Sequence, residues 1–313
     1  MNKTIIQNLL DQYIIPEYSP IILLRESSDN KVFEIGKHDK KILRISKRLL
    51  KKDVQFEFDV ISHFHKYKFP VAQWVKTKNN NIFSSNINGD MAILFDYIYG
   101  YHAIGNNNLL PRKEQARSAG NALGKMCEIG QSFSSTKPRN RNIFTELERA
   151  IKLKNHFINN FEGGDKFIRE IIYFIRFGKH TISKTGLIHN DFRVSNVYFD
   201  KEDKINGIID FDWCCMGPII KDLALGILEW SFPDGKVEPD FGIFDAFLIG
   251  YNSASSIKVT KGTELYLWIQ FAALSDSATY FCDRINSPRL NNRINSSFMY
   301  KKYSYFSTKL HSK

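Results

Sequence analysis

Two short polar segments place the strongest constraint on how this chain can fold. The first runs from 189 to 196 (HNDFRVSN) and the second from 209 to 212 (IDFD), and apolar residues precede each of them. Turn-forming residues at 200–203 predict a hairpin that returns the second segment to the first. The fold must therefore bring three oxygen-bearing side chains to adjoining loops, namely Asp191, Asn196 and Asp210.

These side chains are of the types that phosphoryl transfer requires. Asp191 is an aspartate that could accept the proton of a nearby hydroxyl. Asn196 and Asp210 offer an amide oxygen and a second carboxylate, which suit a Mg²⁺ ion that bridges phosphate oxygens. Any one of them alone could be a turn or capping residue. Together, at this spacing and between apolar strands, they favour chemistry on a magnesium-bound triphosphate.

The N-terminal part of the chain has the pattern of a small β-rich lobe. Alternating or continuous apolar residues predict strands at 21–24, 32–35, 41–45 and 91–98, and apolar residues at helical spacing predict short and long helices at 1–15 and 53–66. Beyond Gly100 the pattern is mainly helical. Helices are predicted around 116–127 and at 144–159, 165–178, 222–228, 240–252 and 263–286. We therefore expect an α+β fold with two lobes, at residues 1–97 and 98–313.

Composition narrows the classes of partner. The net charge of +11 would suit a nucleic acid, but the densest basic run, at 40–52, alternates with apolar residues as a solvated face does. We expect a basic surface and no nucleic-acid partner. The four cysteines lack metal-ligand spacing, and the N-terminus resembles neither a signal peptide nor a membrane span. A cytoplasmic protein without membrane contact is the expectation.

Three motifs resemble the aminoglycoside phosphotransferase, choline kinase and homoserine kinase superfamily, small-molecule kinases with a protein-kinase-like fold. They are H-N-D-x-x-x-x-N at 189–196, I-D-F-D at 209–212 and G-P-x-x-x-D-L-A at 217–224. The resemblance implies that Asp191 is the catalytic base and that Asn196 and Asp210 are magnesium ligands. It also implies that Asp222 is a structural carboxylate that holds the loop after Asp210. Arg193 either contacts the γ-phosphate or is an ordinary surface arginine.

The resemblance also implies a nucleotide site in the first lobe. Ser27, Ser28 and Asn30 stand in the loop over the phosphates, which lacks the usual glycines. Arg44 replaces the strand lysine that contacts the α- and β-phosphates, and Glu57 is either its partner or an exposed helix carboxylate. The backbone at 93–98, which includes Phe95 and Tyr97, would contact the adenine.

The expected function is transfer of the γ-phosphoryl group of Mg-ATP to a hydroxyl of a small molecule. Acidic residues within 226–250 favour a cationic amine or an aminoglycoside as acceptor, or form a solvated surface. The C-terminal segment resembles the last helix of homoserine kinases, and its three arginines either bind a homoserine-like carboxylate or are surface residues of the tail. They are Arg284, Arg289 and Arg293. A catalytically silent, kinase-like nucleotide-binding or interaction module is the alternative, and the oligomeric state is left open.

Overall fold

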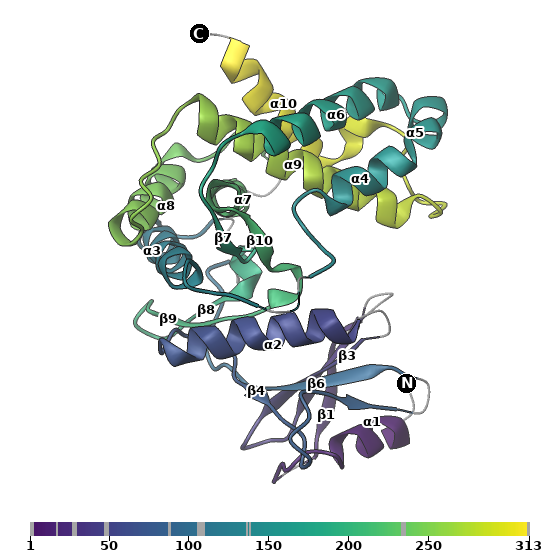
Figure 1. Cartoon of the computed structure of the whole chain (residues 1–313), viewed down its shortest axis with the longest axis vertical. Helices are drawn as coiled ribbons and strands as arrows, with labels where there is room; N and C mark the ends of the chain where they lie inside the picture. The colour runs from purple at the N-terminus through teal and green to yellow at the C-terminus, as the bar shows by residue number, and fades with distance from the viewer. Residues whose placement is uncertain are drawn as a thin grey trace. The chain divides into compact units, whose positions relative to one another are not determined.

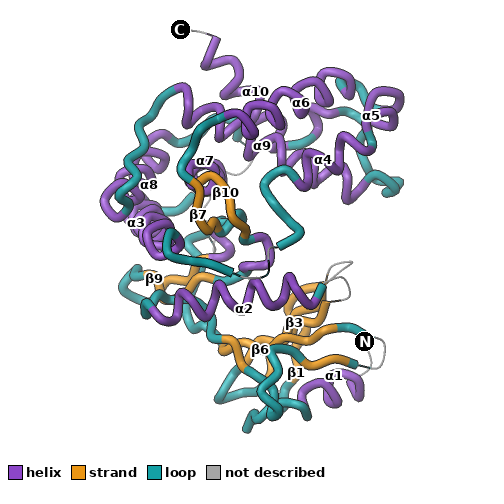
Figure 2. Tube along the Cα trace, in the orientation of Figure 1, coloured by secondary structure: helices purple, strands orange, loops and turns teal. Residues whose placement is uncertain are grey.

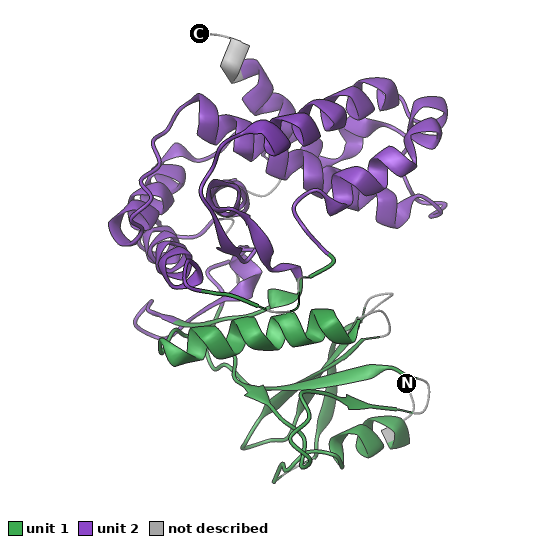
Figure 3. Ribbon diagram, viewed as in Figure 1, with its two compact units in different colours: residues 1–101, 133–140, 206–212 green, residues 102–132, 141–205, 213–313 purple. Residues whose placement is uncertain are grey.

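The computed structural model describes residues 3–16, 18–26, 30–46, 50–86, 89–104, 110–135, 137, 139–232 and 236–311. The chain divides into two compact units, which Figure 3 colours separately. The smaller unit consists of Met1–Tyr101, Phe133–Asn140 and Asn206–Asp212, and the larger one of His102–Ser132, Arg141–Ile205 and Trp213–Lys313. The lobe division between residues 97 and 98 stays a prediction.

The smaller unit is built on an antiparallel sheet. Among the described residues six strands form it, in the order β1-β2-β3-β6-β4, with β5 also pairing with β6 (Figures 1 and 2). The four strands predicted from the sequence are β1, β2, β3 and β6. The bounds are β1 (Ile21–Glu26), β2 (Asn30–Ile35), β3 (Lys41–Ser46), β4 (Trp74–Val75), β5 (Ser84–Ser85) and β6 (Met91–Asp96).

Two helices pack against this sheet, α1 (Lys3–Leu10) and α2 (Lys51–Lys66). Successive side chains of a strand point to opposite faces. On β3, Leu43 and Ile45 lie in the apolar cluster that includes α1, whereas the intervening Arg44 pairs with Glu57 of α2. The sheet therefore packs an apolar cluster against α1 on one face and buries a charged pair against α2 on the other.

The larger unit is mainly helical, as the sequence predicted. Aromatic side chains fill much of its core; Phe167, for example, lies 5.9 Å from Phe281 and 5.7 Å from Tyr300 between ring centroids. The region 144–159, predicted as one helix, forms two. The bounds are α3 (Lys113–Gly130), α4 (Thr145–Lys152), α5 (Lys154–Asn160), α6 (Gly164–His180), α7 (Ile219–Trp230), α8 (Phe241–Ala254), α9 (Thr263–Arg284) and α10 (Phe298–His311).

Two of these helices, α3 and α8, pack with their backbones almost in contact. A Cβ atom added to Gly120 of α3 would lie 2.0 Å from the carbonyl oxygen of Phe247, and one on Gly250 of α8 would lie 2.0 Å from that of Arg117. Only glycine allows such an approach, because any side chain would meet the partner backbone. The two glycines thus fix the distance between α3 and α8.

A small two-stranded sheet in the larger unit leads into the segment of the candidate site. Strand β7 (Thr185–Ile188) pairs antiparallel with β10 (Cys215–Pro218), and Ile188 lies opposite Cys215. The chain leaves β7 directly into the segment 189–196, and it leaves β10 directly into α7. Two further short strands, β8 (Val197–Phe199) and β9 (Ile205–Ile208), follow that segment, as predicted. No described helix is both long and apolar enough to cross a membrane.

Candidate active site

The backbone that leads into Asp191 is held by α7. Asp222, in the first turn of α7, accepts hydrogen bonds from the backbone N–H groups of His189 and Asn190, each at 2.8 Å. Asn190 adopts a left-handed conformation with φ of +62°, which is uncommon outside glycine and recurs at functional loops. Asp222 is thus a structural carboxylate, but these two hydrogen bonds hold the segment before Asp191, whereas the prediction named the loop after Asp210.

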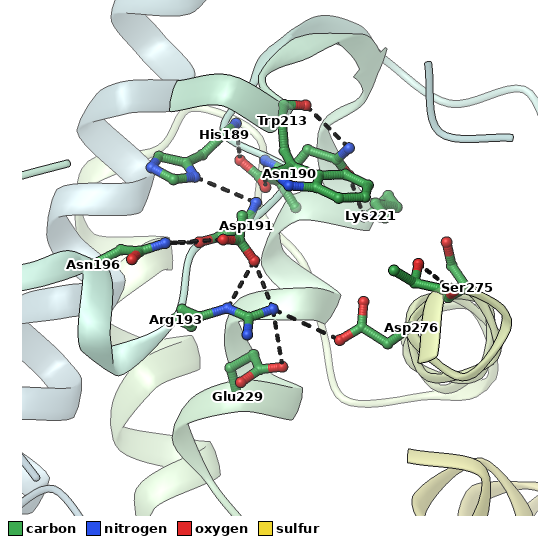
Figure 4. Close-up of polar contacts among 12 residues, drawn as sticks. His189, Asn190, Asp191, Arg193, Asn196, Trp213, Lys221, Glu229, Ser275 and Asp276 are labelled. Atoms are coloured by element: carbon green, nitrogen blue, oxygen red, sulfur yellow. Dashed lines mark hydrogen bonds and ion pairs between the residues drawn. The ribbon is translucent and has the colours of Figure 1, made fainter. Parts of the chain in front are cut away.

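Both carboxylate oxygens of Asp191 have a partner within the same loop, as Figure 4 shows. Oδ1 accepts a hydrogen bond from Arg193 Nε at 2.7 Å and lies 2.6 Å from Arg193 Nη2. Oδ2 accepts a hydrogen bond from Asn196 Nδ2 at 3.0 Å. The carboxylate is therefore held in one orientation by a cation and an amide.

The same contacts set the orientation of the Asn196 amide. Its Nδ2 donates both to Oδ2 of Asp191 and, at 2.9 Å, to the backbone carbonyl of Asp191. Because the nitrogen faces Asp191, the amide oxygen is directed away from it. A buried amide oxygen directed in this way is a ligand of the type that Mg²⁺ prefers.

Arg193 connects Asp191 to two further carboxylates, each from a different helix. Its Nη2 lies 3.9 Å from Glu229 Oε1 on α7 and 3.8 Å from Asp276 Oδ2 on α9. Burial lowers the pKa of Arg193, but the charges of Glu229, Asp191 and Asp276 outweigh it, so the net pKa is raised. Arg193 therefore belongs to an ion network and is not an isolated surface arginine.

A second cation, Lys302 on α10, is influenced by the charges of this network. Its side chain is buried; burial lowers its pKa, although the charges of Glu229 and Asp276 act in the opposite direction. Burial, the larger effect, and Asp276 raise the pKa of Glu229, while Arg193 lowers it. Arg193 is thus in contact with three carboxylates, whereas Lys302 acts on Glu229 and Asp276 through its charge.

In the smaller unit, the predicted pairing of Arg44 with Glu57 is confirmed. Arg44 Nη1 donates to Glu57 Oε1 at 3.0 Å and Nη2 donates to Oε2 at 2.6 Å. Burial lowers the pKa of Arg44, but the charges of Glu57, Asp212 and Asp210 outweigh it and raise the net pKa. The remaining donor, Nε, has no hydrogen-bond partner among the described residues.

The segment at 209–212 brings two carboxylates together. Asp210 has a left-handed backbone with φ of +67°, and its side chain hydrogen-bonds to that of Asp212. Burial, the charge of Asp210 and this hydrogen bond raise the pKa of Asp212 to about 7, although Arg44 and Arg139 lower it. Asp210 and Asp212 thus offer two carboxylates from one short segment, and carboxylate oxygens are ligands that Mg²⁺ prefers. These residues therefore fit Mg²⁺.

The other residues predicted to bind the nucleotide lie at or near the strands of the smaller unit, or outside the described residues. Ser27 and Ser28 lie outside the described residues, and Asn30 is the first residue of β2, opposite Ser46. Phe95 lies on β6 with its ring centroid 5.4 Å from the guanidinium carbon of Arg44. Tyr97 follows β6, and its backbone N–H donates to the Lys40 carbonyl at 3.3 Å. Their contacts with adenine stay predictions.

The C-terminal arginines are not part of the network around Asp191. Arg284 is exposed, with its guanidinium 4.5 Å above the ring of Tyr280, and Arg293 pairs with Glu162 at 2.9 Å. Arg289 is likewise exposed. The network contains Asp276 of α9 instead. No sequence motif includes Asp276, so the sequence alone did not mark it as a functional residue. Asp212, in contrast, stood in the quoted motif without an assigned role.

The sequence is similar to those of known phosphotransferases and kinases. The sequence model described as "Phosphotransferase enzyme family" matches residues 21–255. The homoserine kinase of Zymomonas mobilis is 24% identical over 247 residues, which cover 77% of this chain and 73% of that protein.

Solved structures of low sequence identity share the fold. The amicoumacin kinase hAmiN, in complex with AMP-PNP, Ca²⁺ and Ami, has a TM-score of 0.77 at 14% identity, covering 99% of this chain and 94% of that chain. The choline kinase of Cryptosporidium parvum has a TM-score of 0.67 at 12% identity, covering 99% and 96%. The predicted α+β, kinase-like fold is confirmed.

Proposed function

The chain belongs to the phosphotransferase enzyme family, and from this premise we propose that it transfers the γ-phosphoryl group of Mg-ATP to a hydroxyl of a small amino alcohol. The resemblance drawn from its motifs is confirmed, and the chain is a small-molecule kinase that uses an alcohol group as acceptor. The observation that carries the proposal is the Asp191 carboxylate, which Arg193 and Asn196 hold between them.

Asp191 would act as the general base. The acceptor hydroxyl would give its proton to the carboxylate as its oxygen attacks the γ-phosphorus. The bond between the γ-phosphorus and the β–γ bridging oxygen would break, and ADP would leave with its electron pair. Because Arg193 and Asn196 restrain the carboxylate, little orientational freedom would be lost when the acceptor binds. Arg193 would also lie close enough to the reacting oxygen atoms to offset negative charge there.

The nucleotide would be bound mainly by the smaller unit. Arg44, kept in place by Glu57, would supply positive charge to the phosphates, and its unpaired Nε is a donor that a phosphate oxygen can satisfy. The backbone near Phe95 and Tyr97 would contact adenine. Asn196 and Asp210, with Asp212 beside it, would hold the magnesium ion, which when bound neutralises phosphate charge.

The acceptor would carry a positive charge. Arg193 contacts three carboxylates, and two of them, Glu229 and Asp276, come from helices outside the Asp191 loop. Carboxylates at the site favour an ammonium group on the acceptor. The arginines expected to bind a carboxylate lie outside that network. These observations favour a choline-like amine, an aminoglycoside or a homoserine-like amino alcohol recognised through its amino group.

A substrate panel with direct detection of phosphate transfer tests the proposal. Amino alcohols, aminoglycosides and uncharged sugars would be compared with Mg-ATP as donor. Transfer to amine-bearing alcohols and loss of at least about a hundredfold in kcat in Asp191→Asn are expected. Asp165→Asn, which removes an exposed carboxylate paired with Arg169 on α6, should leave kcat unchanged. Transfer only to uncharged sugars, or an unchanged rate in Asp191→Asn, would contradict the proposal.

A further inference from the structure

Lys221 is a buried cation to which the proposed function assigns no role. It is the third residue of α7, and its side chain is 4% exposed. Its Nζ donates a hydrogen bond to Oδ1 of Asn190, the residue directly before Asp191, as Figure 4 shows. Keeping an ammonium group away from water is costly, so this contact has to offset a substantial desolvation cost.

Asn190 is restrained through its backbone N–H and through both polar atoms of its side chain. Its backbone N–H donates to Asp222 at 2.8 Å, its Nδ2 donates to the Trp213 carbonyl at 3.2 Å, and its Oδ1 accepts from Lys221. The backbone at Asn190 is left-handed, with φ of +62°. Because the side chain is buried, loss of the Lys221 contact would leave Oδ1 without its donor and favour another amide orientation.

Four acidic groups lie near the Lys221 ammonium. Burial, the largest effect, lowers the pKa of Lys221, whereas the charges of Asp222, Asp276, Cys215 and Asp191 raise it. The carboxylates of Asp191 and Asp276 thus influence Lys221 although neither is hydrogen-bonded to it. The charge of this cation therefore interacts with two of the carboxylates that Arg193 contacts.

We propose that Lys221 is a positioning residue for phosphoryl transfer: by holding the Asn190 amide, it fixes the left-handed turn that directs the Asp191 carboxylate towards the acceptor hydroxyl. The inference rests on the proposed function, since it takes Asp191 to be the base. Lys221 itself contacts neither Asp191 nor the reacting atoms. Its effect is transmitted through Asn190.

The first test is the kinetics of Lys221→Met, which keeps the length of the side chain and removes the donor. A misdirected base slows the chemical step more than it weakens binding. We expect kcat to fall roughly ten- to a hundredfold, with KM for ATP and for the acceptor within about twofold of wild type. Lys221→Gln, which keeps a neutral donor, should retain an intermediate kcat.

A matched control removes a lysine of the same unit that also donates to fixed oxygens. Lys258 Nζ donates to the carbonyls of Asn252 and Ser255 near the end of α8. Lys258→Met should leave kcat and both KM values unchanged. An equal loss of kcat in Lys258→Met would show that the effect in Lys221→Met is unspecific and would overturn the proposal.

A double-mutant cycle then tests the route through Asn190. If Lys221 acts only by holding this amide, Lys221→Met adds nothing to Asn190→Ala, and the double variant has the kcat of Asn190→Ala. Effects that multiply in the double variant would show that Lys221 acts independently and would contradict the inference.

Amide hydrogen exchange supplies a readout that does not depend on activity. In Lys221→Met, exchange in peptides covering 187–198 should accelerate several-fold while the rest of the larger unit is unchanged. Unchanged exchange there, or acceleration throughout, overturns the inference on Lys221 even if wild type transfers phosphate. Faster exchange confined to 187–198, in a protein that phosphorylates no acceptor, would instead contradict the proposed function and leave the restraint by Lys221 supported.

Discussion

Arg44 of β3 and Glu57 of α2 form a two-bond ion pair inside the smaller unit, with Nη1–Oε1 and Nη2–Oε2 distances of 3.0 and 2.6 Å. The two residues are only 7% and 1% exposed. Each charge is tolerated in that interior because the other is present. The pair therefore links the charged face of the sheet to α2, and it places the Arg44 guanidinium in a fixed position.

Removing one partner of this pair should be far more damaging than removing both. Arg44→Met leaves Glu57 as a buried, unpaired carboxylate and is expected to lower the free energy of unfolding by about 3–5 kcal/mol. The double variant Arg44→Met/Glu57→Leu should recover most of that loss, as measured by urea denaturation. A loss below about 1 kcal/mol in the single variant would mean that water reaches Glu57.

The amide of Asn196 should determine the magnesium requirement. Asn196→Ala removes the directed amide oxygen and also frees Oδ2 of Asp191, so both metal affinity and turnover should fall. The Mg²⁺ concentration for half-maximal rate is expected to rise roughly ten- to a hundredfold. Asn160→Ala, which removes a surface amide bonded to the His156 carbonyl, is the control. If the rate is lowered equally at all magnesium concentrations, Asn196 acts only by orienting the Asp191 carboxylate and does not bind the metal.

The contact between α3 and α8 should not accept even one additional methyl group. In Gly120→Ala the new Cβ would collide with the Phe247 carbonyl oxygen, 2.0 Å away, and the helices would have to separate. We expect the free energy of unfolding to drop by about 1–3 kcal/mol or more. Gly262→Ala is matched to it, because no atom of the described residues lies within 4 Å of the added Cβ. Similar stability of the two variants would contradict the close approach.

Glu128, at the end of α3, should make stability depend on pH in the acid range. Partial burial raises the pKa of Glu128, but hydrogen bonds from Ser256 and Ser255 outweigh it, and the net pKa lies below its ordinary value. A lowered pKa means that the folded state favours the ionised form. The stabilisation is therefore complete above the unfolded-state pKa of about 4.3 and is lost as pH falls through the folded-state value.

Comparison of wild type with Glu128→Gln measures this effect. At pH 7 the wild type should have the higher urea midpoint, since a carboxylate accepts these hydrogen bonds more strongly than an amide does. At pH 3 the difference should shrink. A difference that stays constant from pH 7 to pH 3 would show that the charge of Glu128 does not contribute.

The spacing of apolar residues along the chain was enough to predict the helices and strands with a regular apolar face. Helix α2 has its apolar residues on one face, and β3 alternates strictly, so both were predicted nearly to their ends. Asp191, Asn196 and Asp210 stood out because their motifs are contiguous in the chain. Glu57 was named as the partner of Arg44 because it is the only glutamate of its helix.

Features formed by distant segments could not be predicted in the same way. Strand β10 contains Gly217 and Pro218, which disfavour strands, yet it pairs with β7, about thirty residues earlier. Asp276 joins Arg193 only because α9 packs near α7. A lysine at position 221 would be expected from the sequence to face solvent, but in the structure Lys221 is buried and donates a hydrogen bond to Asn190. Tertiary packing decided each of these cases.

The smaller unit is assembled from three separate stretches of the chain, and this affects which recombination breakpoints the gene can tolerate. Arg139, from the second stretch, donates to the carbonyls of Phe211 and Asp212 in the third, and Phe211 packs 5.7 Å from Phe64 of α2. A crossover after residue 101 would replace the sheet but leave 133–140 and 206–212 matched to a foreign partner. Functional chimaeras with distant relatives should therefore require exchange of all three stretches together.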